Sequence, residues 1–239
     1  MNEKNAIIIG GTGQIGQCIM DALKREGYHI VCVSQNKVMK EKKKTFVDYY
    51  TFDMSVPEAV NKCCNLISEK YDSADVLVNA IGKNNAGSLN EITEEMWNEV
   101  IDINLKSIFF ICRAFNDLLR KGNNSTIINF SSTAGFRALP KSPHYIAAKA
   151  GVIALSEYFS QIFAPDIRVN CIAPGIVLTD NHKPEYYSDY YEMEKLIPLH
   201  RLTTPEELSN AVVFLIKSTT ITGHTLVIDG GLTLKVAGK

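Results

Sequence analysis

A tyrosine and a lysine four residues apart, Tyr145 and Lys149, are the residues of this chain best suited to proton chemistry. At this spacing two side chains lie on one face of a helix, one turn apart. A free phenol, with a pKa near ~10, exchanges protons poorly at neutral pH, whereas a neighbouring ammonium favours the phenolate. Such a tyrosine could give a proton to a carbonyl oxygen, or take one from an alcohol, during hydride transfer. The spacing alone also fits an amphipathic surface pair, so the rest of the chain must decide.

A glycine-rich stretch at 10–16, Gly-Gly-Thr-Gly-Gln-Ile-Gly, follows an apolar run and precedes a helical pattern. A strand, a glycine-rich turn and a helix are the context of a dinucleotide-binding fingerprint. Gly10 would permit the tight turn, Gly13 would let the backbone approach a pyrophosphate, and Gly16 would let the helix pack close to the sheet. The helix N-terminus would add N–H groups and a favourable dipole for phosphates. The alternative is an ordinary turn between a strand and a helix.

The end of the second predicted strand bears on the choice between NAD and NADP. An acid there would bond the ribose hydroxyls and repel a 2′-phosphate, but the chain has Val-Ser-Gln-Asn-Lys at 33–37. Ser34 and Asn36 can bond a phosphate, and Lys37 with the lysines that follow could neutralise it. NADP(H) is therefore favoured and NAD(H) is possible, although the lysine run also fits a solvated face. Asp53, after the third strand, could bond the adenine amino group or simply end a turn.

Length and composition narrow the class of protein. With 239 residues, 46% of them hydrophobic, the chain suits one α/β domain and is not expected to be disordered. A net charge of −1 gives no reason to expect a nucleic acid or a membrane as partner. No apolar run approaches ~20 residues, and an apolar strand begins almost at the N-terminus, so we expect a cytoplasmic protein. The six cysteines form no Cys-x-x-Cys pair, which favours buried thiols and no metal site.

Short apolar runs alternate along the chain with longer segments of helical period. Strands that are apolar on both faces, separated by helices, predict an α/β fold: a Rossmann-type doubly wound parallel sheet with helices on both faces, in a single domain over 1–239. Seven strands are expected at 6–9, 29–33, 49–52, 76–80, 125–130, 168–173 and 225–228, and helices at 14–25, 57–70, 94–119, 144–163 and 205–216.

From Ile7 to Gly231 these features resemble the short-chain dehydrogenase/reductase family, in its short single-domain branch. The segments at 79–82, 102–105, 174–179 and 229–231 match family motifs in order and spacing. Two serines at 131–132 match the catalytic-serine strand, and Ser132 lies 13 residues before Tyr145, the family's usual interval.

The chain departs from the family pattern in two motifs. Gln14 stands where the short branch has glycine, and Ala80 stands where a second asparagine is usual. The resulting glycine pattern is commoner in the extended branch, which includes sugar-nucleotide epimerases with an added substrate domain. Since 239 residues leave no space for that domain, the short-branch assignment is kept.

The resemblance implies a role for each residue of the set. Tyr145 would be the general acid in reduction, and Lys149 would lower its pKa and bond the nicotinamide ribose. Ser132 would position the substrate oxygen, Asn104 would hold a water that links Lys149 to solvent, and Thr179 would bond the carboxamide of the nicotinamide. Cofactor contacts are implied for Gly10, Thr12, Gly13, Gln14, Ile15, Gly16, Ser34, Gln35, Asn36, Lys37, Asp53, Met54, Asn79, Ala80, Ile81, Gly82, Tyr145, Lys149, Pro174, Gly175, Val177 and Thr179.

The segment 180–199, between the nicotinamide loop and the last predicted helix, is the expected substrate loop or lid. Its four tyrosines, at 186, 187, 190 and 191, would either line an amphipathic pocket or pack a lid helix. We also expect Phe136, Arg137, Leu139 and His144 to border the pocket.

The implied function is hydride transfer between NAD(P)(H) and a small-molecule carbonyl or secondary alcohol. Many relatives reduce 3-oxoacyl groups on acyl carrier protein, but the stretches at 121–125 and 165–167 offer few basic residues for an acidic carrier. Two alternatives come from other classes: an epimerase or dehydratase that retains its cofactor, and a non-catalytic NADP-binding sensor. The resemblance also implies a homo-oligomer, a tetramer or a dimer.

Overall fold

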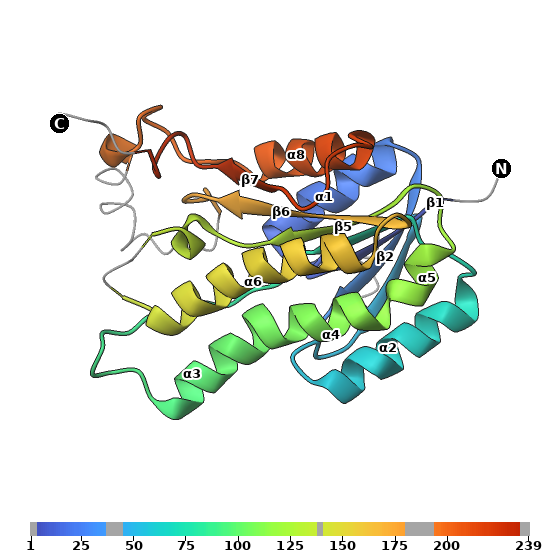
Figure 1. The fold of residues 1–239 in the computed structure, drawn as a ribbon, viewed down its shortest axis with the longest axis horizontal. Coiled ribbons are helices and arrows are strands. Elements are labelled where there is room, and N and C mark those ends of the chain that lie inside the picture. The colour runs from blue at the N-terminus through green and yellow to red at the C-terminus, as the bar shows by residue number, and fades with distance from the viewer. Residues whose placement is uncertain (1–3, 37–44, 138–140, 180–193, 235–239) are drawn as a thin grey trace.

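The computed structural model describes residues 4–36, 45–137, 141–179 and 194–234, and its centre is a seven-stranded sheet (Figure 1). All six strand pairings are parallel, in the order β3-β2-β1-β4-β5-β6-β7. The strands are β1 (Lys4–Ile9), β2 (Tyr28–Ser34), β3 (Val47–Thr51), β4 (Val76–Asn79), β5 (Ser125–Phe130), β6 (Ile167–Pro174) and β7 (Thr225–Ile228).

Helices cover both faces of this sheet (Figure 1). On one face lie α1 (Gln14–Arg25) and α8 (Pro205–Lys217); on the other lie α2 (Pro57–Lys70), α4 (Ser107–Ala114) and α6 (Pro143–Ile162). The strands are apolar on both faces because successive side chains point to opposite layers: Ile8 packs in one core cluster, Ile7 and Ile9 in the other. The predicted doubly wound fold is confirmed. None of the described helices is long and apolar enough to cross a membrane.

The strand order reverses between β1 and β4, which are paired through Ile9 and Asn79 at their carboxyl ends. In such sheets a crevice opens outside the carboxyl ends of the strands at this switch point, where ligands bind. The turn after β1 carries the glycine loop, and the turn after β4 carries the segment that begins at Ala80. The topology therefore brings two of the predicted cofactor segments together.

The single helix expected at 94–119 is wrong in detail. The chain forms α3 (Glu94–Ile101), a π-helical turn (Asp102–Lys106), α4, and α5 (Asn116–Arg120). One wider turn barely changes the spacing of hydrophobic residues along the sequence, so the periodicity did not predict it. Turns with i→i+5 hydrogen bonds often occur at functional sites. The π turn contains Asn104, whose side chain is fully buried.

Candidate active site

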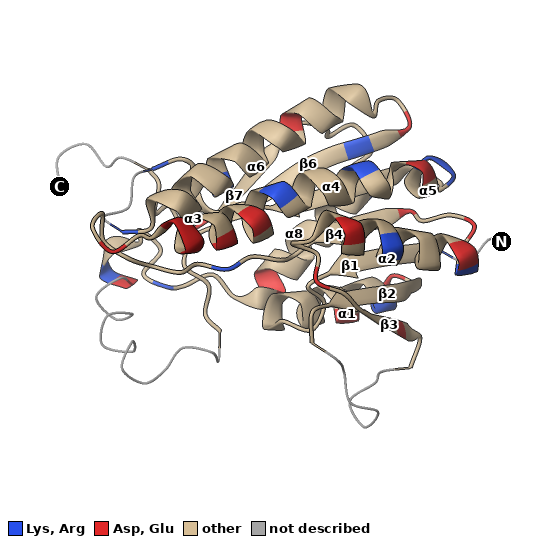
Figure 2. Ribbon diagram, turned by 90° about the horizontal axis from the view of Figure 1, so that it is seen from below, with Lys and Arg blue, Asp and Glu red and all other residues tan. Residues whose placement is uncertain are grey.

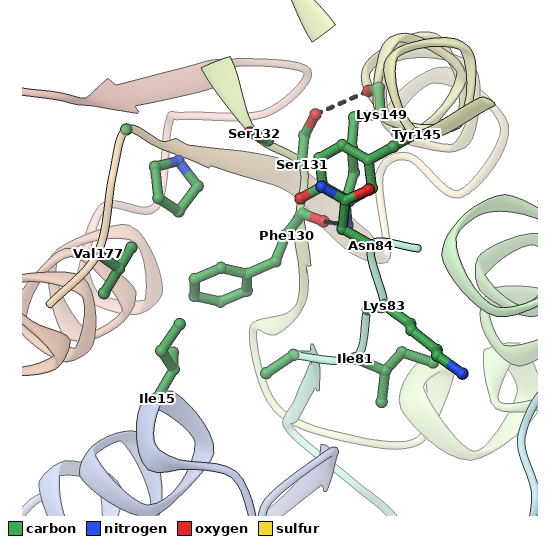
Figure 3. Close-up of a pocket in the computed structure, with 14 residues that line it drawn as sticks. Ile15, Ile81, Lys83, Asn84, Phe130, Ser131, Ser132, Tyr145, Lys149 and Val177 are labelled. Carbon is green, nitrogen blue, oxygen red and sulfur yellow. Dashed lines mark hydrogen bonds between the residues drawn. The ribbon is translucent and has the colours of Figure 1, made fainter. Parts of the chain in front are cut away.

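Two adjoining pockets lie at the carboxyl ends of the strands and share Ala80, Ile81 and Gly82. Each has a volume of about 230 Å³, so together they reach the ~300–1,000 Å³ of small-molecule sites. We call them the catalytic pocket and the adenosine pocket. The catalytic pocket is lined further by Ile15, Lys83, Asn84, Phe130, Ser131, Ser132, Tyr145, Lys149, Pro174, Gly175 and Val177 (Figure 3), and the adenosine pocket by Ile9, Gly10, Thr12, Gly13, Val33, Ser34, Gln35, Asn36, Phe52, Asp53, Met54 and Ile103.

The first two turns of α6 carry Tyr145 and Lys149, which lie one helical turn apart and both line the catalytic pocket. The Lys149 ammonium lies 5.5 Å from the centroid of the Tyr145 ring and donates to the Phe130 carbonyl oxygen at 3.0 Å (Figure 3). The Ser131 hydroxyl donates to the Lys149 carbonyl at 2.7 Å and ties the end of β5 to α6. Ser132 caps the next short turn, because its hydroxyl accepts from the Ala134 N–H at 3.1 Å. The predicted serine, tyrosine and lysine are therefore brought to one pocket.

Burial dominates the electrostatics of this pocket. Lys149 is only 3% exposed, and burial lowers its pKa from 10.5 to about 8. Burial also raises the pKa of Tyr145, and a hydrogen bond with Ser132 opposes that rise. The lowering of the Tyr145 pKa that we expected from Lys149 is not found: the net direction is upward, because the phenol is desolvated and the ammonium is directed to a backbone carbonyl.

Asn104 does not line the catalytic pocket, but its side chain bonds the main chain of Lys83, which does. Its amide nitrogen donates to the carbonyl oxygens of Val100, at 2.9 Å, and Lys83, at 2.7 Å. Its amide oxygen accepts from the Lys83 N–H at 3.3 Å. A Cβ on Gly82 would fall 2.8 Å from this oxygen, so the loop after β4 approaches Asn104 this closely only with glycine there.

The glycine loop has the shape that a pyrophosphate needs. Gly10 has a φ of +83°, and a Cβ on it would lie 2.5 Å from the Ala80 carbonyl oxygen. A Cβ on Gly16 would lie 2.3 Å from the Gly10 oxygen, so α1 packs directly against the loop. Gly13 is the N-cap of α1 and makes no side-chain cap hydrogen bond, and the N-terminus of a helix favours the binding of phosphate groups. These residues fit a dinucleotide cofactor.

At the far end of the adenosine pocket the polar side chains bond one another. The Gln35 amide donates to Asp53 at 3.0 Å, and the same carboxylate accepts from the Ser55 N–H and hydroxyl. The Ser34 hydroxyl donates to the Asn36 carbonyl at 2.8 Å. No basic residue lines this pocket in the part of the chain that the structure describes, and Lys37 lies outside it.

Several predicted site residues lie elsewhere. Asn79 is fully buried and donates to the Asn129 amide oxygen at 2.8 Å, between β4 and β5. Gln14, Gly16 and Thr179 line neither pocket.

The four residues expected to border the substrate pocket do not line the catalytic pocket where the structure describes them. His144 is fully buried, stacks on Trp97 and does not line the catalytic pocket. Phe136 is 50% exposed, and Arg137 donates to the Leu232 carbonyl. Leu139, the four lid tyrosines and most of the expected lid, 180–193, lie outside the described residues.

Sequence reasoning missed Lys83, Asn84, Phe130 and Ser131 in the catalytic pocket, and Ile9, Val33, Phe52 and Ile103 in the adenosine pocket. All but Ile103 lie at or just beyond the carboxyl end of a strand, and that position was the available signal. Among the described residues, no group of three or more histidines, cysteines and carboxylates is arranged to hold a metal ion.

Comparison with known proteins agrees with this geometry. A family model described as enoyl-(acyl carrier protein) reductase matches residues 11–233. The 3-oxoacyl-[acyl-carrier-protein] reductase FabG of Chlamydia muridarum is 35% identical over 241 residues, covering 96% of this chain and 97% of that protein. The NAD-dependent glycerol dehydrogenase of Listeria innocua is 28% identical over 243 residues, covering 98% and 96%.

Among solved structures, ElxO with NADP bound has a TM-score of 0.89 and 28% identity, covering 97% of this chain and 99% of its own. The fold, the glycine loop and the shared pocket of serine, tyrosine and lysine agree with matches that span nearly the whole chain. The chain is an oxidoreductase that belongs to the short-chain dehydrogenase/reductase family, whose members bind NAD(P).

Proposed function

We propose that this oxidoreductase interconverts a small ketone and a secondary alcohol, with Tyr145 exchanging the proton. One observation carries the proposal: Ser132, Tyr145 and Lys149 line the same pocket as the 174–177 segment, and the glycine loop lines the pocket beside it. A dinucleotide held by the glycine loop would thus have its other end beside the phenol.

The cofactor, when bound, supplies a hydride to the substrate carbon or accepts one from it. Gly10, Thr12 and Gly13 would hold its pyrophosphate, and the segments 80–82 and 174–177 would flank the nicotinamide, with Thr179 on its carboxamide.

The protein's own side chains handle the oxygen and its proton. The Ser132 hydroxyl holds the substrate oxygen, and the Tyr145 phenol donates to it as the alcohol forms. The Lys149 ammonium stabilises the phenolate left behind and would bond the nicotinamide ribose. Asn104 keeps the loop after β4 in place and would hold a water on the path from Lys149 to solvent.

Purified protein tests this proposal directly. NADPH or NADH oxidation is followed with a panel of ketones for the wild type and for Ser132→Ala. We expect turnover by the wild type and a loss of about a hundredfold or more in the variant, because the substrate oxygen loses its partner. Equal rates for the two proteins would contradict the assignment.

We propose that NADP(H) is preferred. Two findings support this preference: Ser34, not an acid, ends β2, and the similar structure of ElxO holds NADP. Fluorescence titration should show tighter binding of NADPH than of NADH. In Ser34→Asp the order should shift toward NADH by about tenfold or more, because a carboxylate repels the 2′-phosphate and bonds the ribose. Equal affinities in the wild type would contradict the preference.

A second candidate substrate is a 3-oxoacyl group on acyl carrier protein, favoured by the identity of 35% with FabG. The same acetoacetyl group is offered on the carrier protein and on a small thiol. A carrier that raises kcat/KM about tenfold or more supports this candidate, and equal values favour a free small molecule.

We further propose a homo-oligomer, a tetramer by resemblance, that buries an apolar groove between α4 and α6. Phe109, Phe110, Leu155 and Tyr158 line this groove, and Tyr158 is 52% exposed. Figure 2 shows α6 almost free of charged residues along its length. Exposed apolar surface of this kind marks an interface. Light scattering should give a multiple of 26.6 kDa, and a smaller mass for Tyr158→Lys.

None of the six cysteines, all within the described residues, is in a disulfide, and most are buried. Cysteines outside disulfides are usual in reducing compartments, so they support the proposed cytoplasmic location.

A further inference from the structure

The loop that follows β4 is fixed on both sides of one residue, Asn84. The Lys83 N–H donates to the buried side chain of Asn104 at 3.3 Å, and the Lys83 carbonyl oxygen accepts from it at 2.7 Å. The side chains of Lys83 and Asn85 both donate to the carboxylate of Glu99 on α3. The two neighbours of Asn84 are therefore held toward α3.

Asn84 itself is oriented differently. It lines the catalytic pocket together with Ser132, Tyr145 and Lys149. In Figure 3 the side chain of Lys83 extends away from the Tyr145 phenol, whereas the carboxamide of Asn84 turns toward it. Its side chain is exposed, and no described residue makes a hydrogen bond with its carboxamide.

A carboxamide offers two N–H donors and an acceptor oxygen, so it can bond a hydroxyl or a carbonyl group. In the proposed reaction Ser132 and Tyr145 take the reacting oxygen. A further polar group at the pocket wall is then free to take a second oxygen of the substrate. A hydrogen bond between this carboxamide and a second oxygen would favour ketones that carry the oxygen over analogues that lack it.

We propose that Asn84 is a specificity-determining residue that selects ketones carrying a second oxygen, as hydroxyl or carbonyl, close to the reacting carbon. This inference rests on the proposed function. Because the loop is anchored at residues 83 and 85, the main chain of Asn84 is in place before substrate arrives, and only its side chain has to be ordered when substrate binds.

A matched pair of ketones tests the inference. In 3-hydroxybutan-2-one and 3-methylbutan-2-one a hydroxyl and a methyl group occupy the same position, so the ratio of their kcat/KM values isolates the second oxygen. The ratio is measured for the wild type, for Asn84→Leu and for the control Asn90→Leu, with ethyl 3-oxobutanoate as a third substrate. Asn90 is exposed in the same segment and lines neither pocket.

We expect the wild type to favour an oxygenated ketone, and Asn84→Leu to lower that preference by about threefold to tenfold. The control should keep the ratio within about twofold. An unchanged ratio in an Asn84→Leu protein that still turns over ketones would overturn the inference and leave the proposed function intact. A variant that only weakens NADPH binding would also overturn it, because the carboxamide would then serve the cofactor. If the wild type turns over no ketone with either cofactor, the proposed function fails and the inference with it.

Discussion

Replacing Lys149 with methionine should make the stability of this protein respond differently to pH. The side chain is 3% exposed, and burial lowers its pKa from 10.5 to about 8. The difference corresponds to roughly 3 kcal/mol against the protonated form in the folded protein. Methionine has a similar length and no charge, so the variant is free of this penalty.

The direction of the effect follows from proton counts. Between about pH 8 and pH 10.5 the unfolded wild type binds more protons than the folded wild type, so its stability rises with pH in that window. The variant lacks this contribution. The free energy of unfolding of Lys149→Met, minus that of the wild type, should therefore fall by about 2 kcal/mol between about pH 6.5 and pH 9.5.

Urea unfolding at the two pH values, at one protein concentration, measures this difference and cancels the titration of all other groups. Lys62→Met, an exposed change on α2, serves as the control and should give a constant difference. A constant difference for Lys149→Met as well, or one that grows with pH, would refute the argument that burial sets the charge state of Lys149. Turnover should fall at least about a hundredfold in the same variant.

Three other substitutions test separate parts of the molecule. Tyr145→Phe removes the proton donor, so kcat should fall by about 10²–10⁴ while fluorescence titration still shows NADPH binding. Gly16→Ala places a Cβ 2.3 Å from the Gly10 carbonyl oxygen, and calorimetry should show NADPH affinity weakened about tenfold or more with a lower Tm. Burial raises the pKa of Asp48, but hydrogen bonds from Lys70 and two ring side chains outweigh it and lower the pKa to about 2. In urea unfolding, Asp48→Asn should therefore lower the free energy of unfolding by about 1 kcal/mol at neutral pH. This loss should shrink as the pH falls from 3.8 toward 2.

The sheet could be predicted from the sequence because its strands are apolar on both faces and a glycine-rich stretch marks the turn after the first strand. The bounds of α1 and α2 were also predicted, since each has one clear amphipathic stripe. The break of the predicted 94–119 helix was not, because a π turn preserves the apolar pattern on either side of it. The local pattern of apolar and polar residues does not show whether a helical turn is closed by i→i+4 or i→i+5 hydrogen bonds.

The site was predicted unevenly for a related reason. Ser132, Tyr145 and Lys149 have a fixed interval along the chain, and the fold converts that interval into one pocket. The direction of the Tyr145 pKa depends on how much packed protein surrounds the phenol, which sequence spacing does not contain. Asn79 was expected at the cofactor, yet its amide joins two strands.

The π turn at 102–106 holds one residue more than a regular α-helical turn. Deleting one residue within it would restore regular α-helical hydrogen bonding and would leave α3 and α4 facing as they do now. A deletion within α3 has no such wide turn to absorb it, so everything downstream would rotate by about 100° about the helix axis. Ile108 and Ile111, now in the core, would then turn away from the sheet, and Asn104 would no longer face the loop after β4. Insertions and deletions in α3 should therefore be far less tolerated than substitutions on its exposed face.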